Sequence, residues 1–105
     1  MTSPQKTFET LQEIATSHSW KVFPNAMGSI TISKDTTEVL LLGTSSANRI
    51  THVNISKCSI RFNHARYDFS DKGVEVNTFD PAVTNTLDYE SAIAEITALF
   101  KKGWG

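Results

Sequence analysis

Two segments with a helical repeat of apolar residues enclose a middle segment rich in strand-forming residues. In residues 3–18 and again in residues 88–102, apolar side chains recur at helical spacing, which places them on one face of a helix. A chain of 105 residues has the usual length of one domain and is long enough to bury one core. We therefore predict a single domain over residues 1–105 with a helix near each end.

Both predicted helices carry suitable residues in their first turn. Ser3 stands before Pro4, a typical N-cap followed by a proline at the first helical position. Asp88 is the corresponding N-cap of the second helix, and Glu90 suits the positive end of its dipole. The second helix is expected to stop at Gly103, which follows two lysines.

The middle of the chain is expected to form an antiparallel sheet of five or six strands. Apolar runs of strand length occur at residues 20–23, 29–33, 38–42, 67–70 and 74–79. Asp80 and Pro81 are expected to end the sheet, which leaves residues 82–86 as a connecting or contact loop. The predicted fold class is α+β, a two-layer sandwich in which both helices cover one face of the sheet.

A change of register follows Ile55. Val53 and Ile55 stand at odd positions, but the next apolar residues, Ile60 and Phe62, stand at even ones. One flat strand cannot turn both pairs toward the same core. A hairpin turn at residues 56–59 is one solution, since it pairs Ile55 with Ile60. A bulge in a single long strand is the other, because the turn lacks the glycine or asparagine that tight hairpins favour.

Charge is unevenly distributed along a chain whose net charge is only −1. Residues 39–66 hold four basic residues and no acidic one, whereas residues 67–100 hold seven acidic residues and one basic residue. The overall balance argues against a dedicated nucleic-acid or membrane-surface protein. No apolar run has the length of a membrane span, and the first residues lack the apolar core of a secretory signal. We expect a cytoplasmic protein.

The hairpin alternative brings polar side chains together on the sheet face that points away from the core. His52 then faces Asn63, and Asn54 faces Arg61. Guanidinium and amide groups donate hydrogen bonds in fixed geometry, which suits carboxylates and phosphates. An ordinary solvated sheet face is the alternative reading of the same pattern. The predicted partner-binding residues are Arg49, His52, Asn54, Arg61, Asn63 and Arg66.

The sequence contains none of the motifs that mark common catalytic or cofactor sites. It has no HExxH, GxSxG, P-loop or dinucleotide-binding pattern. Its one cysteine excludes an internal disulfide and a cysteine-based zinc site. Cys58 with His52 or His64 is a conceivable nucleophile and base, but a lone cysteine is more often a small apolar residue. We predict no enzyme activity, no metal site and no cofactor.

These observations favour a small non-catalytic domain that binds another protein with an acidic surface. An inhibitor, immunity-type or adaptor protein, of the kind that phages and other mobile elements encode, fits this description. The alternative is a nucleic-acid-binding accessory protein that uses the basic sheet region of residues 49–66, although we expect no aromatic side chain there to stack on bases. A homodimer formed through an uncovered edge strand is also compatible with such a sheet.

Overall fold

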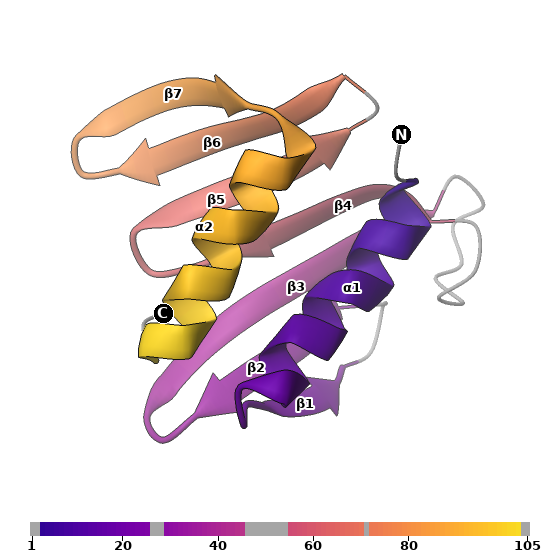
Figure 1. Ribbon diagram of the computed structural model, residues 1–105, viewed down its shortest axis with the longest axis vertical. Helices are drawn as coiled ribbons and strands as arrows, with labels where there is room; N and C mark the ends of the chain where they lie inside the picture. Colours follow the sequence, from indigo (N-terminus) through magenta and orange to yellow (C-terminus); the bar gives the residue numbers. More distant parts are fainter. Residues whose placement is uncertain (1–2, 26–28, 46–54, 71, 104–105) are drawn as a thin grey trace.

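The computed structural model describes residues 3–25, 29–45, 55–70 and 72–103. In these ranges the chain forms two helices and one antiparallel sheet of seven strands (Figure 1). The strands lie side by side in the order of the chain, so the sheet is a meander. The elements are α1 (Pro4–Ser17), β1 (Lys21–Pro24), β2 (Ser29–Lys34), β3 (Thr37–Ser45), β4 (Ile55–Arg61), β5 (Ala65–Ser70), β6 (Gly73–Phe79), β7 (Ala82–Leu87) and α2 (Tyr89–Lys102).

The predicted α+β class and the antiparallel sheet are confirmed, but the predicted strand count is wrong. The additional strand is β7, in the segment for which the sequence predicts a loop. Asp80 and Pro81 do not end the sheet; they form the turn between β6 and β7, where Phe79 pairs with Ala82. Every residue of β7 except Leu87 is exposed, so no alternation of buried residues marks this strand in the sequence.

β4 is one continuous strand between β3 and β5, so the predicted hairpin turn at residues 56–59 is wrong. The alternative, a bulge, is confirmed. Thr44 pairs with Lys57, but its neighbour Ser45 pairs with Ile55, which leaves Ser56 as the extra residue on β4. A bulge of this kind shifts the alternation by one position and accounts for the change of register in the sequence.

Both helices lie on the same face of the sheet (Figure 1). α1 packs against β1, β3, β4 and β5, and α2 packs against β6 and α1. The buried apolar side chains of the sheet point toward the helices and form one core with Phe8, Leu11 and Ala15 of α1 and with Ala92, Ile96 and Phe100 of α2. Because the even residues of β4 and the odd residues of β5 belong to this core, their neighbours in sequence point to the other face.

Both predicted helix caps are present. The Ser3 hydroxyl accepts a hydrogen bond of 3.2 Å from the Lys6 amide, and the Asp88 carboxylate accepts one of 2.7 Å from the Ser91 amide. Gly103 closes α2 in the left-handed conformation that glycine adopts readily. In the described part of the chain, neither helix is long and apolar enough to cross a membrane.

Candidate functional site

On the face of the sheet that points away from the helices, polar and apolar side chains are arranged by strand register. None of the helices or strands in the described ranges packs on it. We call it the open face. Strand pairing aligns one row of side chains across it, namely Phe23, Thr31, Leu40, Arg61, Arg66, Asn77 and Thr84.

The structure brings three of the six predicted partner-binding residues to one region. Arg61 and Arg66 are directly opposite each other on β4 and β5, and both are exposed. Asn63, in the turn between these strands, is also exposed. The other three predicted residues lie outside the described residues; they are Arg49, His52 and Asn54.

The predicted pairing of Arg61 with Asn54 is wrong. Arg61 pairs instead with Leu40 on one side and with Arg66 on the other. The physical reason is the continuous β4 strand: both of its edges are already hydrogen-bonded, to β3 and to β5, so it cannot fold back on the residues before it. The predicted pairing of His52 with Asn63 depended on the same hairpin and is lost with it.

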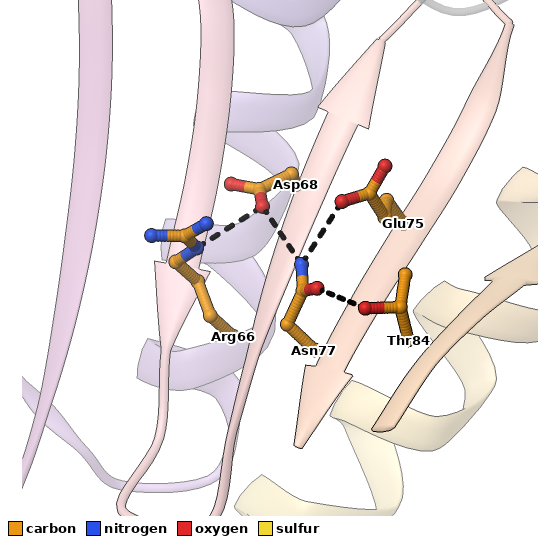
Figure 2. Close-up of polar contacts among 5 residues, drawn as sticks. All are labelled: Arg66, Asp68, Glu75, Asn77 and Thr84. Carbon is orange, nitrogen blue, oxygen red and sulfur yellow. Dashed lines mark hydrogen bonds and ion pairs between the residues drawn. The ribbon is translucent and has the colours of Figure 1, made fainter. Parts of the chain in front are cut away.

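A hydrogen-bonded network crosses the open face from β5 to β7 (Figure 2). Arg66 donates from Nε to Asp68 at 3.0 Å, and Asn77 donates to the same carboxylate oxygen at 3.3 Å. Asn77 also donates to Glu75 at 3.2 Å and accepts a hydrogen bond of 2.8 Å from the Thr84 hydroxyl. The Arg66 and Asp68 side chains are 48% and 36% exposed, so water screens their attraction and this ion pair adds little to stability.

Arg61 has a different environment from its neighbour Arg66. Its guanidinium carbon lies over the ring of Phe79, 5.1 Å from the ring centroid. Arg66 forms an ion pair with Asp68, whereas Arg61 has no carboxylate partner among the described residues. The aromatic ring therefore supports the Arg61 side chain while its charge and its hydrogen-bond donors face solvent.

Two shallow hollows flank the pair of arginines. One has a volume of about 450 Å³, and its lining includes Arg66, Lys57 and Glu75. The other has a volume of about 370 Å³, and its lining includes Arg61, Asn63, Leu40 and the acidic residue Glu38. Since Arg61 and Asn63 line the same hollow, their donors can act on one bound group.

The open face is not uniformly basic. Asp68 and Glu75 are paired across β5 and β6, and both stand on the open face beside Arg66. Toward β3 the surface is more apolar, because Leu40 and Leu42 turn to this side and are only partly buried. The open face therefore has an acidic, amide-rich side at β5 and β6, an apolar side at β3, and between them Arg61, which has no carboxylate partner in the described ranges.

Cys58 is not placed to act as a nucleophile. Its side chain is only 2% exposed and belongs to the core. Burial raises the pKa of the Cys58 thiol to about 12, so it stays protonated at neutral pH. Within the described ranges, no group of three or more His, Cys, Asp or Glu side chains is close enough to hold a metal ion.

Comparisons with protein families, with curated proteins and with solved structures found no match for this chain.

Sequence reasoning missed two aromatic residues on the open face. Phe79 and Phe23 are 41% and 50% exposed, and both stand on the side of the sheet opposite the core. The expectation of no stacking aromatic concerned residues 49–66 alone and did not include Phe79, which lies over Arg61 of that region. The signal was present for Phe79: Val74 and Val76 alternate toward the core, so the odd-numbered Phe79 had to point the other way.

Proposed function

We propose that this chain is a small non-catalytic domain that binds another protein through the open face of its sheet, with Arg61 at the centre of the contact. The observation that carries the proposal is the position of the Arg61 guanidinium, 5.1 Å from the Phe79 ring and without a carboxylate partner among the described residues. Arginine and aromatic residues are enriched among the side chains that dominate binding energy in protein interfaces.

The Phe79 ring favours binding because it limits the freedom of Arg61 before a partner arrives. An ordered side chain loses less conformational entropy when it is buried in an interface. The guanidinium presents a planar fork of donors that fits a carboxylate with two parallel hydrogen bonds. We therefore expect the partner to place an aspartate or glutamate side chain against Arg61 and Asn63, although Glu38 lines the same hollow and repels a second carboxylate there.

Apolar side chains around this hollow supply the remaining contact. Phe79 is 41% exposed, and Leu40 lies beside Arg61 on the neighbouring strand. Phe23 is farther along the same row, on β1, and is 50% exposed. A partner that covers this row together with Phe79 buries two aromatic rings and supplies hydrogen-bond acceptors to Arg61, a composition typical of the core of a protein interface. An inhibitor, an immunity-type protein or an adaptor works by such docking.

The test compares four proteins in parallel capture from a lysate of the source cells, with nuclease added. The proteins are the natural chain, Arg61→Glu, Phe79→Ala and Lys101→Glu. Lys101 is exposed on α2, on the opposite side of the molecule, so its variant controls for the change in net charge. We expect a protein that the natural chain and Lys101→Glu capture in stoichiometric amounts, and that Arg61→Glu and Phe79→Ala do not.

Capture of the same protein by all four chains would place the contact elsewhere and refute the role of the open face. Circular dichroism and urea unfolding of each variant show that a loss of capture is not a loss of folding. Since both substituted side chains are exposed, we expect the free energy of unfolding to change by about 0.5 kcal/mol or less for Arg61→Glu.

Binding of single-stranded nucleic acid is the second candidate, and the exposed rings of Phe23 and Phe79 favour it. The acidic side chains of Asp68 and Glu75 on the same face oppose it, because they repel a phosphate backbone. A labelled single-stranded oligonucleotide at low salt decides between the two. Binding that weakens steeply with salt and is lost in Phe79→Ala supports nucleic acid, whereas no binding at low salt excludes it.

A further inference from the structure

β7 is an edge strand that nothing in the described part of the molecule covers. It pairs with β6 on one side, and Figure 1 shows it as the outermost strand of the sheet. Its sequence, Ala-Val-Thr-Asn-Thr-Leu, contains no charged residue and no proline. Natural proteins usually place such residues on an exposed edge to prevent pairing with another chain. β7 therefore has the properties of a strand that accepts a partner strand.

The opposite edge of the sheet is protected. β1 has only four residues, and these include a lysine at its start and a proline at its end. Pro24 has no amide hydrogen to donate, and Lys21 is exposed. Only one of the two edges is therefore suited to pairing. A chain with one such edge forms a closed pair with a second copy rather than an open fibre.

The backbone of β7 presents its free groups at alternate residues. The Phe79 amide donates to the His64 carbonyl at 3.1 Å, on the β5 side of β6. The neighbouring residue, Thr78, therefore directs its backbone groups toward β7, where it is paired with Val83. By the same alternation, Thr84 and Thr86 direct their N–H and C=O groups outward, where a second strand can bind them.

We propose that two copies of this chain pair antiparallel through β7, about a two-fold axis at Asn85, and join their sheets into one. In this register Thr84 faces Thr86 of the second copy on the open face, and Val83 faces Leu87 of the second copy on the helix side. Threonine pairs and pairs of apolar side chains are favourable across antiparallel strands. Val83 is 44% exposed in the single chain, so its burial contributes to the pairing.

Side-chain pairing favours this register over an axis at Thr84. An axis at Thr84 would place Val83 opposite Asn85 of the second copy, whereas the axis at Asn85 places Val83 opposite Leu87. A pair of apolar side chains across two antiparallel strands is more favourable than an apolar side chain opposite an amide.

A pair of six-residue strands is a small interface, below about 1,200 Å², so the dimer should dissociate on dilution. Sedimentation velocity of the natural chain over a range of concentrations should show a mass that rises from 11.6 kDa toward twice that value. Asn85→Lys and Asn85→Glu each place two like charges at the axis, and each should remain monomeric. Ala98→Lys adds the same charge on the exposed face of α2 and should dimerise as the natural chain does.

Mixing the two Asn85 variants separates the proposal from a folding defect. The lysine of one chain and the glutamate of the other attract each other, so an equimolar mixture should dimerise although neither variant does alone. A mixture that stays monomeric would overturn the proposal, as would a natural chain that remains at 11.6 kDa at millimolar concentration.

Disulfide formation tests the register. At the axis, Asn85 faces its own copy in a pair without hydrogen bonds, where Cα atoms are about 4.5 Å apart and a disulfide can form. Asn85→Cys should therefore give a covalent dimer under mild oxidation. Thr86→Cys should not, because that residue faces Thr84. The natural Cys58 is buried and does not interfere. Cross-linking of both variants to the same extent would contradict the proposed axis.

Discussion

The indole nitrogen of Trp20 donates a hydrogen bond of 2.9 Å to the carbonyl oxygen of Phe100, and their rings meet edge to face at 5.2 Å. Trp20 precedes β1, and Phe100 lies in the last turn of α2, so this contact joins the two ends of the fold. It also gives the buried indole N–H the partner that it requires in an apolar environment.

Replacing Trp20 by Phe should lower the free energy of unfolding by about 1–3 kcal/mol. The substitution removes the hydrogen bond to the Phe100 carbonyl and leaves space where the indole was, since Trp20 is only 3% exposed. Urea unfolding followed by circular dichroism measures the change. Phe23→Leu, at a half-exposed ring, is the control and should cost about 0.5 kcal/mol or less. Equal losses in the two variants would mean that Trp20 does not hold the ends together.

Stability should decrease at alkaline pH because two buried acids keep their protons in the folded state. Burial raises the pKa of Cys58 from 9.0 to about 12. Burial, together with the nearby charge and hydrogen bond of Glu95, raises the pKa of Tyr67 from 10.0 to about 12. The unfolded chain loses these protons first, so the contribution is fully present below the unfolded pKa and is lost as pH rises toward the folded one.

The expected slope is about 1.4 kcal/mol per pH unit for each group that is ionised only in the unfolded state. Urea unfolding at several pH values checks it. Cys58→Ala should flatten the curve from about pH 9 upward, whereas Tyr67→Phe should change it only above about pH 10. A curve for Cys58→Ala that runs parallel to that of the natural chain would show that the thiol ionises normally in the fold.

The N-cap of α2 should make the stability of the fold decrease at acidic pH. Hydrogen bonds from Ser91 lower the pKa of the Asp88 carboxyl below its ordinary value of 3.8. The sign is opposite to that of the buried acids: this contribution is present above the unfolded pKa and is lost as pH falls through the folded pKa. Asp88→Asn keeps a good cap without a titrating group. The difference in melting temperature between Asp88→Asn and the natural chain should be smaller at low pH than at neutral pH. If the difference is the same at both pH values, the Asp88 carboxylate does not stabilise the helix through its charge.

Two glycines with positive φ should respond differently to alanine. Gly73 has a φ of +129°, and an added Cβ there would lie 3.2 Å from the Leu87 carbonyl oxygen. Gly103 has a φ of +81°, and its added Cβ would have no neighbour within 4 Å. We expect Gly73→Ala to cost about 2–3 kcal/mol and Gly103→Ala about 1 kcal/mol. Thermal unfolding of both variants measures the two losses of stability. A greater loss in Gly103→Ala than in Gly73→Ala would contradict the prediction.

The elements that were predicted correctly are those whose signals are local. Ser3 and Asp88 mark helix starts by residue type alone, and both accept the expected backbone hydrogen bonds. The end of the second helix was predicted at Gly103, which closes α2 with a positive φ. In contrast, β7 carries no buried alternation, so its only support is its pairing with β6, which the order of residues does not display.

The candidate site depended on long-range pairing and was predicted only in part. Arg61, Asn63 and Arg66 are brought together because a single turn joins β4 and β5. The contact of Arg61 with Phe79 requires that β5 separate β4 from β6 and that all three strands be in register. The choice between a hairpin and a bulge after Ile55 rested on the partner strand β3, whose register cannot be read from β4 alone.

A sheet whose strands follow one another in chain order can assemble one hairpin at a time as the chain leaves the ribosome. Each new strand needs only a connection to the strand before it, so the entropy lost in closing these loops is modest. The helix that packs on β6 is synthesised after the sheet, because α2 follows all seven strands in the chain. Until then the apolar residues that α2 will cover, such as Val74 and Val76, face water, and the nascent protein depends on rapid docking of its final helix to avoid aggregation.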